Sequence, residues 1–217
     1  AREHYQDISA ERSLMIVAKS QKEGKGRQGK TWEESEQGLY ATYVFKIDQE
    51  INNLGAFSLV AGLSVHKVLS NYSPNFFVKW PNDILSKDGK KISGILIENW
   101  TIDKIKCLSV GVGVNLSGKV FGVGNATSLF EQSGRKITPI RMAGHIGHEL
   151  RNNWSNFKSG GFEKFVELWD KNTHPKNSIL SAKYDNRTVI GEYKGVNVDG
   201  SLNLYVNNEI KTIRTPI

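Results

Sequence analysis

The chain has 217 residues, of which 38% are hydrophobic and 24% charged, a balance that is typical of a folded domain and excludes wholesale disorder. Its net charge of +7 suits a phosphate-bearing ligand, a nucleic acid or an acidic protein partner, although a solvated lysine-rich surface would explain it equally well. The single cysteine, Cys107, excludes an intramolecular disulfide. No signal-peptide pattern or membrane-length apolar run is seen, so we expect a cytoplasmic protein.

Apolar runs and turn signals predict strands with one helix between them in the first half of the chain. A polar stretch at residues 4–12 could be the tail of a helix. The patterns then predict, in chain order, strands at residues 14–18 and 39–45, a helix at 54–72, a strand at 76–80, a hairpin of 84–85 and 92–98 around a turn at Asp88-Gly89, and a strand at 105–116.

Two helices are predicted next. Thr138 is a good N-cap residue, and Pro139 follows it at the first helical position, so an amphipathic helix should begin here. Apolar residues then recur at a spacing of three and four as far as Phe157. A further amphipathic helix is predicted at residues 162–169.

The last residues, 177–217, change to short strands with turn signals at Asp185-Asn186 and Asp199-Gly200. This tail is too short for a large domain, so we expect a small β-barrel behind a larger domain at residues 1–176. Strands, then helices, then strands indicate an α+β fold, with a mixed β-sheet packed with helices, and not a regular βαβ fold.

Residues 24–31, Gly-Lys-Gly-Arg-Gln-Gly-Lys-Thr, match two nucleotide-binding motifs in spelling. One is the dinucleotide-binding GxGxxG and the other is the P-loop GxxxxGK[ST]. Both motifs require a helix that begins at the loop, whereas a short polar stretch and then a strand follow here. The glycines still free backbone N–H groups for phosphate oxygens, Lys25 and Arg27 add positive charge, and Trp32 offers a flat face for a base. A flexible solvated turn is the alternative.

Residues 79–83, Lys-Trp-Pro-Asn-Asp, end a predicted strand, because proline cannot donate to a central ladder. This exposes Asn82 and Asp83 near a sheet edge or a cleft. Asp83 could bind Mg²⁺, which prefers carboxylate and phosphate oxygens, although a simple Asn-Asp turn cap would also explain the pair.

Lys91 begins the next apolar strand, where it could neutralise a carboxylate and a phosphate, and Gly94 leaves space above the sheet. A plain two-residue turn at Asp88-Gly89 would point Lys91 away from the face of Asp83. If the two residues serve one site, the hairpin must contain a bulge or a three-residue loop.

Residues 111–116, Gly-Val-Gly-Val-Asn-Leu, alternate strictly. The valines and the leucine should face the core, and Gly111, Gly113 and Asn115 should face the other way. Two glycines on one face form a strip on which a flat ligand can lie against the backbone, with Asn115 as a polar group at its end.

Together these segments resemble the biotin–protein ligase family. The resemblance is carried, in this order, by Gly-Lys-Gly-Arg-Gln-Gly-Lys-Thr-Trp, Lys-Trp-Pro-Asn-Asp-Ile, Lys-Ile-Ser-Gly-Ile-Leu-Ile-Glu and Gly-Val-Gly-Val-Asn, and it covers nearly the whole chain. It implies a class II synthetase-like catalytic domain with an SH3-like C-terminal domain. It also implies an enzyme that activates biotin with ATP and Mg²⁺ to biotinyl-5′-AMP, and then transfers biotin to a lysine of an apo biotin carboxyl carrier domain.

The resemblance further implies a role for individual residues. Lys91 and Arg27 are the expected catalytic residues, and Asp83 is the expected metal ligand. The positions expected to bind biotin are Gln21, Gly24, Lys25, Gly26, Arg27, Lys91, Gly94, Gly111 and Val112. Those expected to bind the nucleotide are Arg27, Trp32, Asn82, Lys91 and Asn115.

Two departures from the family pattern stand out. Lys25 stands where the family commonly has arginine, so the charge is kept and the guanidinium fork is lost. The Ser-Thr pair that binds the ureido group in the family does not occur in this sequence ahead of the loop. No helix-turn-helix pattern precedes the loop either, so DNA binding is not expected, and a homodimer is possible.

Two other functions stay open. A lipoate–protein ligase would have a related fold and a related adenylation, and a non-enzymatic biotin-sensing or nucleic-acid-binding module would suit the net charge. The spacing His145-x-x-His148-Glu149 suggests a metal site, but without a third histidine on this polar helix face we expect these side chains to be solvated.

Overall fold

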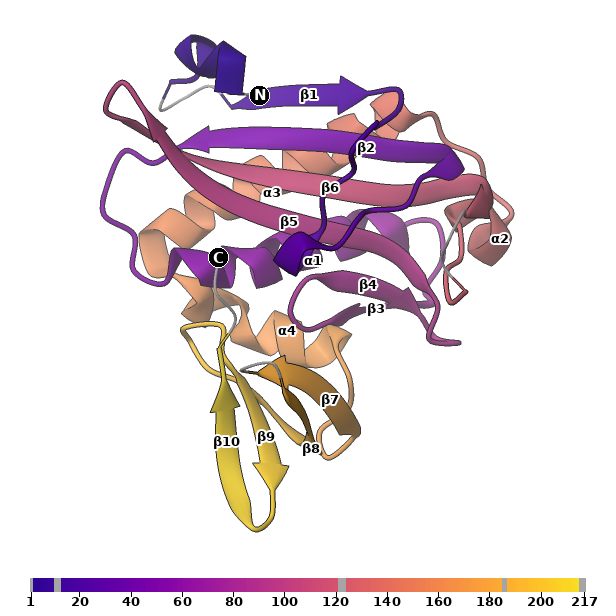
Figure 1. Cartoon of the computed structure of the whole chain (residues 1–217), viewed down its shortest axis with the longest axis vertical. Coiled ribbons are helices and arrows are strands. Elements are labelled where there is room, and N and C mark those ends of the chain that lie inside the picture. The colour runs from indigo at the N-terminus through magenta and orange to yellow at the C-terminus, as the bar shows by residue number, and fades with distance from the viewer. Residues whose placement is uncertain (1, 10–12, 121–123, 185–186, 215–217) are drawn as a thin grey trace.

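The computed structural model describes residues 2–9, 13–120, 124–184 and 187–214. Within these ranges the strands form a large sheet and a smaller C-terminal sheet (Figure 1). The large sheet has the order β1-β2-β6-β5-β4-β3. Its strands are β1 (Leu14–Ala18), β2 (Ser35–Lys46), β3 (Phe76–Lys79), β4 (Asp83–Ser86), β5 (Lys91–Ile102) and β6 (Ile105–Val120).

All neighbouring strands of the described large sheet pair antiparallel, so the prediction of a mixed sheet was wrong. Short connections decide this, because a strand that returns beside its predecessor through a tight turn must run antiparallel to it. β5 and β6, for example, are joined by Asp103 and Lys104, which both have positive φ, as the favoured two-residue hairpin turns require.

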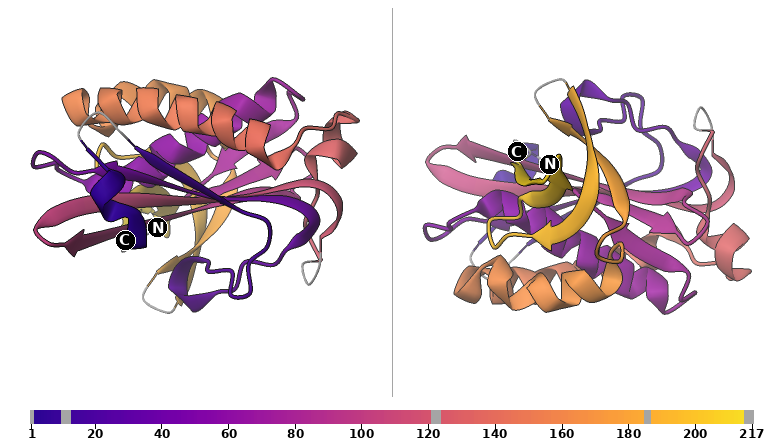
Figure 2. Two further views of the ribbon diagram at one scale, coloured as in Figure 1. Left: turned by 90° about the horizontal axis from the view of Figure 1, so that it is seen from above. Right: turned by 90° about the horizontal axis from the view of Figure 1, so that it is seen from below.

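The α-helices pack on one face of the large sheet. The glycine-rich loop lies over the opposite face, which carries no α-helix among the described residues (Figure 2). The α-helices are α1 (Phe57–Ser70), α2 (Leu129–Ser133), α3 (Pro139–Gly160) and α4 (Val166–Asn172). The short 3₁₀ helices are η1 (Arg2–Asp7), η2 (Arg27–Gly29), η3 (Leu54–Ala56) and η4 (Phe162–Phe165). α1 is buried on nearly all sides because it lies between the sheet and α3 and α4.

Most sequence-based elements are confirmed. β1 has the predicted bounds, and α3 begins at Pro139 behind Thr138, as the N-cap signal indicates. The helices predicted at 54–72 and 162–169 each begin with a 3₁₀ turn. The polar stretch near the N-terminus contains only η1, and residues 10–12 lie outside the described residues.

The C-terminal sheet has the order β10-β9-β8-β7 and is also antiparallel. Its strands are β7 (Ile179–Tyr184), β8 (Arg187–Val196), β9 (Leu202–Val206) and β10 (Glu209–Ile213). Its inner face, with Tyr193 and Leu204, is part of the same hydrophobic core as the large sheet. The predicted turn at Asp199-Gly200 is present, and the one at 185–186 lies outside the described residues.

Candidate active site

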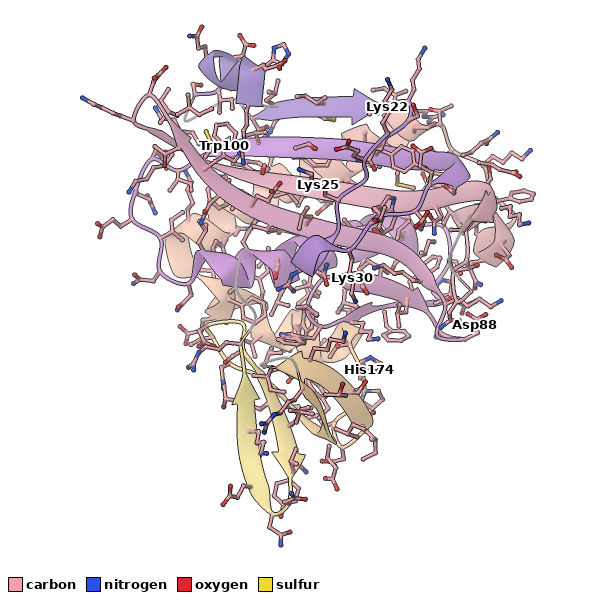
Figure 3. The ribbon with its side chains drawn as sticks, viewed as in Figure 1. Lys22, Lys25, Lys30, Asp88, Trp100 and His174 are labelled. Carbon is pink, nitrogen blue, oxygen red and sulfur yellow. The ribbon has the colours of Figure 1, made fainter. Side chains whose placement is uncertain are left out.

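A cavity of about 460 Å³ lies on the open face of the large sheet, under the glycine-rich loop. Its wall is formed by the loop, by the turn between β3 and β4, by β5 and β6, and by β7 of the C-terminal sheet. Of the predicted site residues, the cavity brings together Gln21, Lys25, Gly26, Arg27, Trp32, Asn82, Asp83, Lys91, Gly94, Gly111 and Val112. In Figure 3, Lys25 and Lys30 lie in front of the sheet, on the loop that covers this cavity.

The loop closes on itself through its backbone. The amide N–H of Trp32 donates to the carbonyl of Gly24 (2.9 Å), and that of Gly26 donates to the carbonyl of Lys30 (2.6 Å). Between these closures only one short 3₁₀ turn, η2, is formed, and the chain then runs into β2. The P-loop and dinucleotide-binding alternatives both require a longer helix at this place, and the loop conformation excludes them.

Lys91 and Asp83 form an ion pair on the cavity wall, with 2.6 Å between Nζ and Oδ1. The hairpin register explains how they meet. Ile84 pairs with Ser93, but Leu85 pairs with Lys91, so Ile92 is an extra residue in β5. Such a bulge re-aims the side chains on either side of it. The predicted bulge is therefore confirmed, and it turns Lys91 to the face of Asp83.

The backbone of Lys91 is held firmly. Its N–H donates to the carbonyl of Asn125 (3.0 Å), and its carbonyl accepts from the N–H of Thr127 (2.9 Å). Thr127 in turn accepts a bond from the side-chain amide of Asn115 (3.1 Å). Asn115 is only 2% exposed and does not line the cavity, and its Oδ1 is buried without a hydrogen-bond partner among the described residues. Its expected contact with a nucleotide stays a prediction.

The glycine strip on β6 carries a flat group, which is the ring of Trp32. A Cβ at Gly113 would stand 2.5 Å from this ring, and one at Gly94 would stand 2.7 Å from it. Lys91 Nζ lies 5.4 Å from the ring centroid. At Gly111, by contrast, a Cβ would meet nothing closer than 3.6 Å. A ligand therefore has access to the strip at Gly111, and meets the Trp32 ring at Gly113.

The other predicted residues take defined places. Asn82 exchanges hydrogen bonds with the backbone of Ile95, which fixes the turn after β3. The backbone amide of Gln21 donates to the carboxylate of Glu34. The side chain of Gln21 is not used in this bond, and Gln21 lines the cavity. Gly24 lines a neighbouring hollow between the loop and β5. Burial lowers the pKa of the Arg27 guanidinium, and the negative charge of Asp83 opposes this shift.

Several cavity residues escaped the sequence-based prediction. Lys79, which precedes Trp80, pairs with Asp83 across β3 and β4, and directly opposed residues share a face. The register alone could have found it. Glu98 and Ser109 oppose each other on β5 and β6 and also line the cavity. Ser181, Ala182 and Lys183 of β7 approach from the C-terminal sheet, and no signal in the sequence indicates this.

The metal alternative on α3 finds no support. The nearest polar partner of His148 is Asn152, at 3.1 Å, and Glu149 pairs with Lys67 at 2.9 Å. Among the described residues, no group of three histidine, cysteine or acidic side chains is placed to hold a metal ion. No helix among the residues that the structure describes is long and apolar enough to cross a membrane.

The sequence matches the model of the biotin/lipoate A/B protein ligase family over residues 3–115, which is more than half of the chain. The chain belongs to this family. The chain is 27% identical over 213 residues to a bifunctional ligase/repressor BirA from Bacillus subtilis. The match covers 94% of the chain and 65% of that relative. A biotin–[acetyl-CoA-carboxylase] ligase from Paracoccus denitrificans is 23% identical over 200 residues, which cover 88% of the chain and 83% of the relative.

A solved structure supports the same membership. The biotin protein ligase from Aquifex aeolicus, in complex with biotin and ATP, is 27% identical and superimposes with a TM-score of 0.80. The superposition covers 97% of this chain and 90% of that one. The α+β fold, with a large antiparallel sheet packed with helices, is therefore the catalytic fold of the biotin/lipoate A/B protein ligase family. The chain spans slightly less than two thirds of the length of the Bacillus subtilis relative.

Proposed function

We propose that this protein is a biotin–protein ligase, which activates biotin with ATP to biotinyl-5′-AMP and transfers biotin to a lysine of an apo biotin carboxyl carrier domain. The observation that carries the proposal is the Lys91–Asp83 ion pair in a cavity covered by a basic, glycine-rich loop. The relatives and the solved complex named above support the choice of substrates.

The first step joins two anions. A carboxylate oxygen of biotin attacks the α-phosphorus of ATP, the bond from that phosphorus to the bridging oxygen of the β-phosphate breaks, and pyrophosphate leaves with the electron pair. Negative charge grows at the α-phosphate during this step. Lys91 and Arg27 are the cations placed to offset that charge, and their fixed positions in a cavity make the interaction strong.

The second step transfers the acyl group. The uncharged amine of the acceptor lysine attacks the carbonyl carbon of the mixed anhydride, AMP leaves, and the amide nitrogen loses a proton. Water would compete for the same anhydride, so the loop over the cavity serves to keep water out.

Asp83 is suited to Mg²⁺, since magnesium at nucleotide sites is commonly held by one or two carboxylates together with phosphate oxygens. The carboxylate lies on the cavity wall beside Lys91, where phosphate oxygens would arrive. When bound, the ion supplies positive charge to the phosphates. Asp83 also holds the Lys91 ammonium in place before any ligand binds.

We infer that biotin and the adenine of ATP bind in different parts of the same cavity. Trp32 presents its ring beside Lys91, so adenine is assigned to this end. Asn115, whose Oδ1 is buried without a hydrogen-bond partner among the described residues, is assigned to the nucleotide from the family resemblance alone. Biotin is assigned, from the family resemblance, to Gln21, Gly24, Lys25, Gly26, Gly94, Gly111 and Val112, of which all but Gly24 line the cavity. Asn82 supports the nucleotide end through its bonds to Ile95.

We further infer that residues 1–176 are the catalytic domain and that residues 177–217 are the SH3-like domain of the family. The inward strand faces of the four-stranded C-terminal sheet support this assignment, because they pack on the catalytic core. A cytoplasmic location, a homodimer and the identity of the carboxylase acceptor stay predictions.

The test is isotope exchange between pyrophosphate and ATP, followed by biotin transfer to a carrier domain. We expect exchange that requires biotin and that lipoate does not replace. Lys91→Ala should lower exchange by about 100-fold or more, which is the scale for loss of a positioned charge in a transition state. Lys211→Ala, on the exposed side of β10, is the matched lysine control and should be active.

Exchange driven by lipoate instead of biotin would identify a lipoate–protein ligase. Biotin binding without any exchange would identify a non-enzymatic biotin-sensing module. Full exchange by Lys91→Ala would remove Lys91 from its catalytic role.

A further inference from the structure

The backbone next to Lys91 on the β6 side comes from outside the regular sheet. The pairing of β6 with β5 begins at Ser93, which lies opposite Val114. At Lys91 the place of β6 is taken by residues 125–127, here called the bridge segment, which forms an isolated parallel bridge through Ala126. On the other side of Lys91 the bulge interrupts the pairing with β4. A regular ladder therefore does not fix the direction of the Lys91 side chain, and the bridge segment must contribute to it.

The bridge segment is itself held by side chains. The amide of Asn125 donates to the carbonyl of Gly89 in the hairpin turn (3.1 Å). Thr127 is only 1% exposed, and its hydroxyl has two partners. The hydroxyl donates to Oε2 of Glu131 (2.7 Å) and accepts from Nε2 of Gln132 (3.1 Å). The Thr127 side chain therefore connects the bridge segment to α2.

The short helix α2 is the support for these bonds. Figure 1 shows it at the end of the large sheet where β6 ends. A helix of five residues is not stable by itself, so its anchors decide its position. Leu129 is completely buried, and the Ser128 hydroxyl caps the helix by accepting from the backbone N–H of Glu131 (3.3 Å). With both ends of the connection anchored, the position of α2 is passed on through Thr127 to the backbone of Lys91.

We propose that Thr127, together with Glu131, is a positioning residue for Lys91. The hydroxyl bond to α2 fixes the bridge segment, and the two backbone bonds of that segment fix the strand at Lys91. This rests on the proposed function, in which the Lys91 ammonium offsets the charge that grows at the α-phosphate. Neither positioning residue belongs to the described cavity wall, so they act on the reaction through Lys91. Displacement of a charge from its place in the transition state lowers the rate more than it lowers the affinity for the ligands.

Glu131 contributes an acceptor oxygen and not a charge. Its Oε1 lies 4.0 Å from Nζ of Lys90, and 56% of the Glu131 side chain is exposed, so this ion pair contributes little. Its Oε2, by contrast, accepts from the buried Thr127 hydroxyl. Glu131→Gln keeps an oxygen for this bond and should behave like the wild type, whereas Glu131→Ala removes the acceptor.

The experiment measures biotin-dependent exchange between pyrophosphate and ATP in the full chain. Thr127→Val removes the hydroxyl and keeps the shape of the side chain. Thr127→Val and Glu131→Ala should each lower kcat by about tenfold, while the apparent KM for ATP and for biotin stays within about twofold of the wild-type value. Thr127→Ser keeps the hydroxyl and should restore most of the rate. Thr101→Val, at the exposed far end of β5, is the control for a lost threonine hydroxyl.

The same substitution in the Lys91→Ala background separates positioning from a general structural role. A residue that acts through Lys91 has no ammonium left to position there. Exchange by the double variant should therefore equal exchange by Lys91→Ala, measured at a correspondingly higher enzyme concentration. A structural role predicts the same tenfold loss in both backgrounds, and that result would overturn the proposal. Glu131→Ala, at an exposed position, gives the same comparison if Thr127→Val folds poorly.

Two further outcomes would also remove the positioning role. One is a kcat of Thr127→Val and Glu131→Ala that matches an active wild type, and the other is a raised KM with an unchanged kcat, which would identify a ligand contact. In both cases the proposed function would still stand. If the wild-type protein forms no adenylate at all, the proposed function fails, and the positioning role fails with it.

Discussion

Lys91 Nζ lies 2.6 Å from Oδ1 of Asp83, although a regular hairpin would have pointed these two side chains to opposite faces of the sheet. One extra residue, Ile92, produces the contact, because it reverses the alternation of β5 at the point where the strand enters the cavity. The pair is partly exposed, with 32% and 25% of the two side chains accessible, so its contribution to the free energy of unfolding is small, roughly 0–1 kcal/mol. Its importance is therefore expected in catalysis.

Asp83→Asn tests this separation of catalysis from stability. The substitution is nearly isosteric, removes the negative charge beside Lys91, and removes the proposed Mg²⁺ ligand. We expect biotin-dependent exchange to fall by about 100-fold and the Mg²⁺ concentration for half-maximal activity to rise. The free energy of unfolding should change by no more than about 1 kcal/mol, which shifts the melting temperature by only a few degrees. A variant that keeps the wild-type Mg²⁺ dependence would contradict the assignment of Asp83.

Gly113→Ala and Gly111→Ala should have different effects, although the two glycines lie on one face of β6. The new methyl group at position 113 would meet the Trp32 ring at 2.5 Å and must displace it, whereas at position 111 the nearest atom is 3.6 Å away. We expect Gly113→Ala to raise the KM for ATP by about tenfold, equivalent to about 1.4 kcal/mol, with a smaller effect on biotin.

Gly111→Ala should instead raise the KM for biotin, because the methyl group enters the uncovered part of the strip. Gly144→Ala on α3 is the control, since no atom lies within 4 Å of a Cβ there. Steady-state kinetics with each substrate varied in turn would measure both constants. Equal effects of the two β6 substitutions on ATP would argue against Trp32 as the nucleotide platform.

Tyr193→Phe should weaken the attachment of the C-terminal sheet. The indole N–H of Trp169 on α4 donates to the Tyr193 hydroxyl (3.1 Å), and both side chains are buried in the core. Removal of the hydroxyl leaves the indole N–H buried without an acceptor, which costs about 1–3 kcal/mol. Urea denaturation would measure this loss. Tyr205→Phe, whose hydroxyl lies on the exposed face near Asn208, should change stability by no more than about 0.5 kcal/mol.

The stability of the protein should decrease in mild acid, in part through His174, which lies where the two sheets meet (Figure 3). Burial, and then the positive charge of Lys79, lower the pKa of His174 in the folded protein. The unfolded chain therefore binds this proton at a higher pH than the folded chain. The contribution of neutral His174 is complete above roughly pH 6.5 and is lost as the pH falls below that value.

Thermal melts at about pH 7.5 and about pH 5.5 would check this, since one pH lies above and the other below the ordinary pKa of histidine. His174→Gln should show a smaller fall in melting temperature between the two conditions than the wild type. Some decrease should persist, because burial also lowers the pKa of His66. His145→Gln, on the exposed face of α3, serves as the control. An identical fall in wild type and His174→Gln would refute the assignment.

Local patterns were enough to predict much of the site. The alternation of residues 111–116 placed Val112 and Val114 in the core, and their burial confirms it. Hairpin parity predicted the bulge near Lys91, because side-chain direction in a strand depends only on position and register. The Thr138-Pro139 signal likewise predicted the start of α3.

The arrangement of the whole cavity depends on contacts between distant parts of the chain. The sequence alone determined where the main strands and helices lie, which face the residues at 111–116 take, and that Lys91 and Asp83 require an irregular hairpin to meet. Only the tertiary structure decided that Trp32 covers Gly113, that Asn115 holds Thr127, and that Lys183 joins Lys79 across two sheets. The physical reason is that periodicity reports the direction of a side chain within one element, whereas the distance between elements depends on how their buried faces pack together.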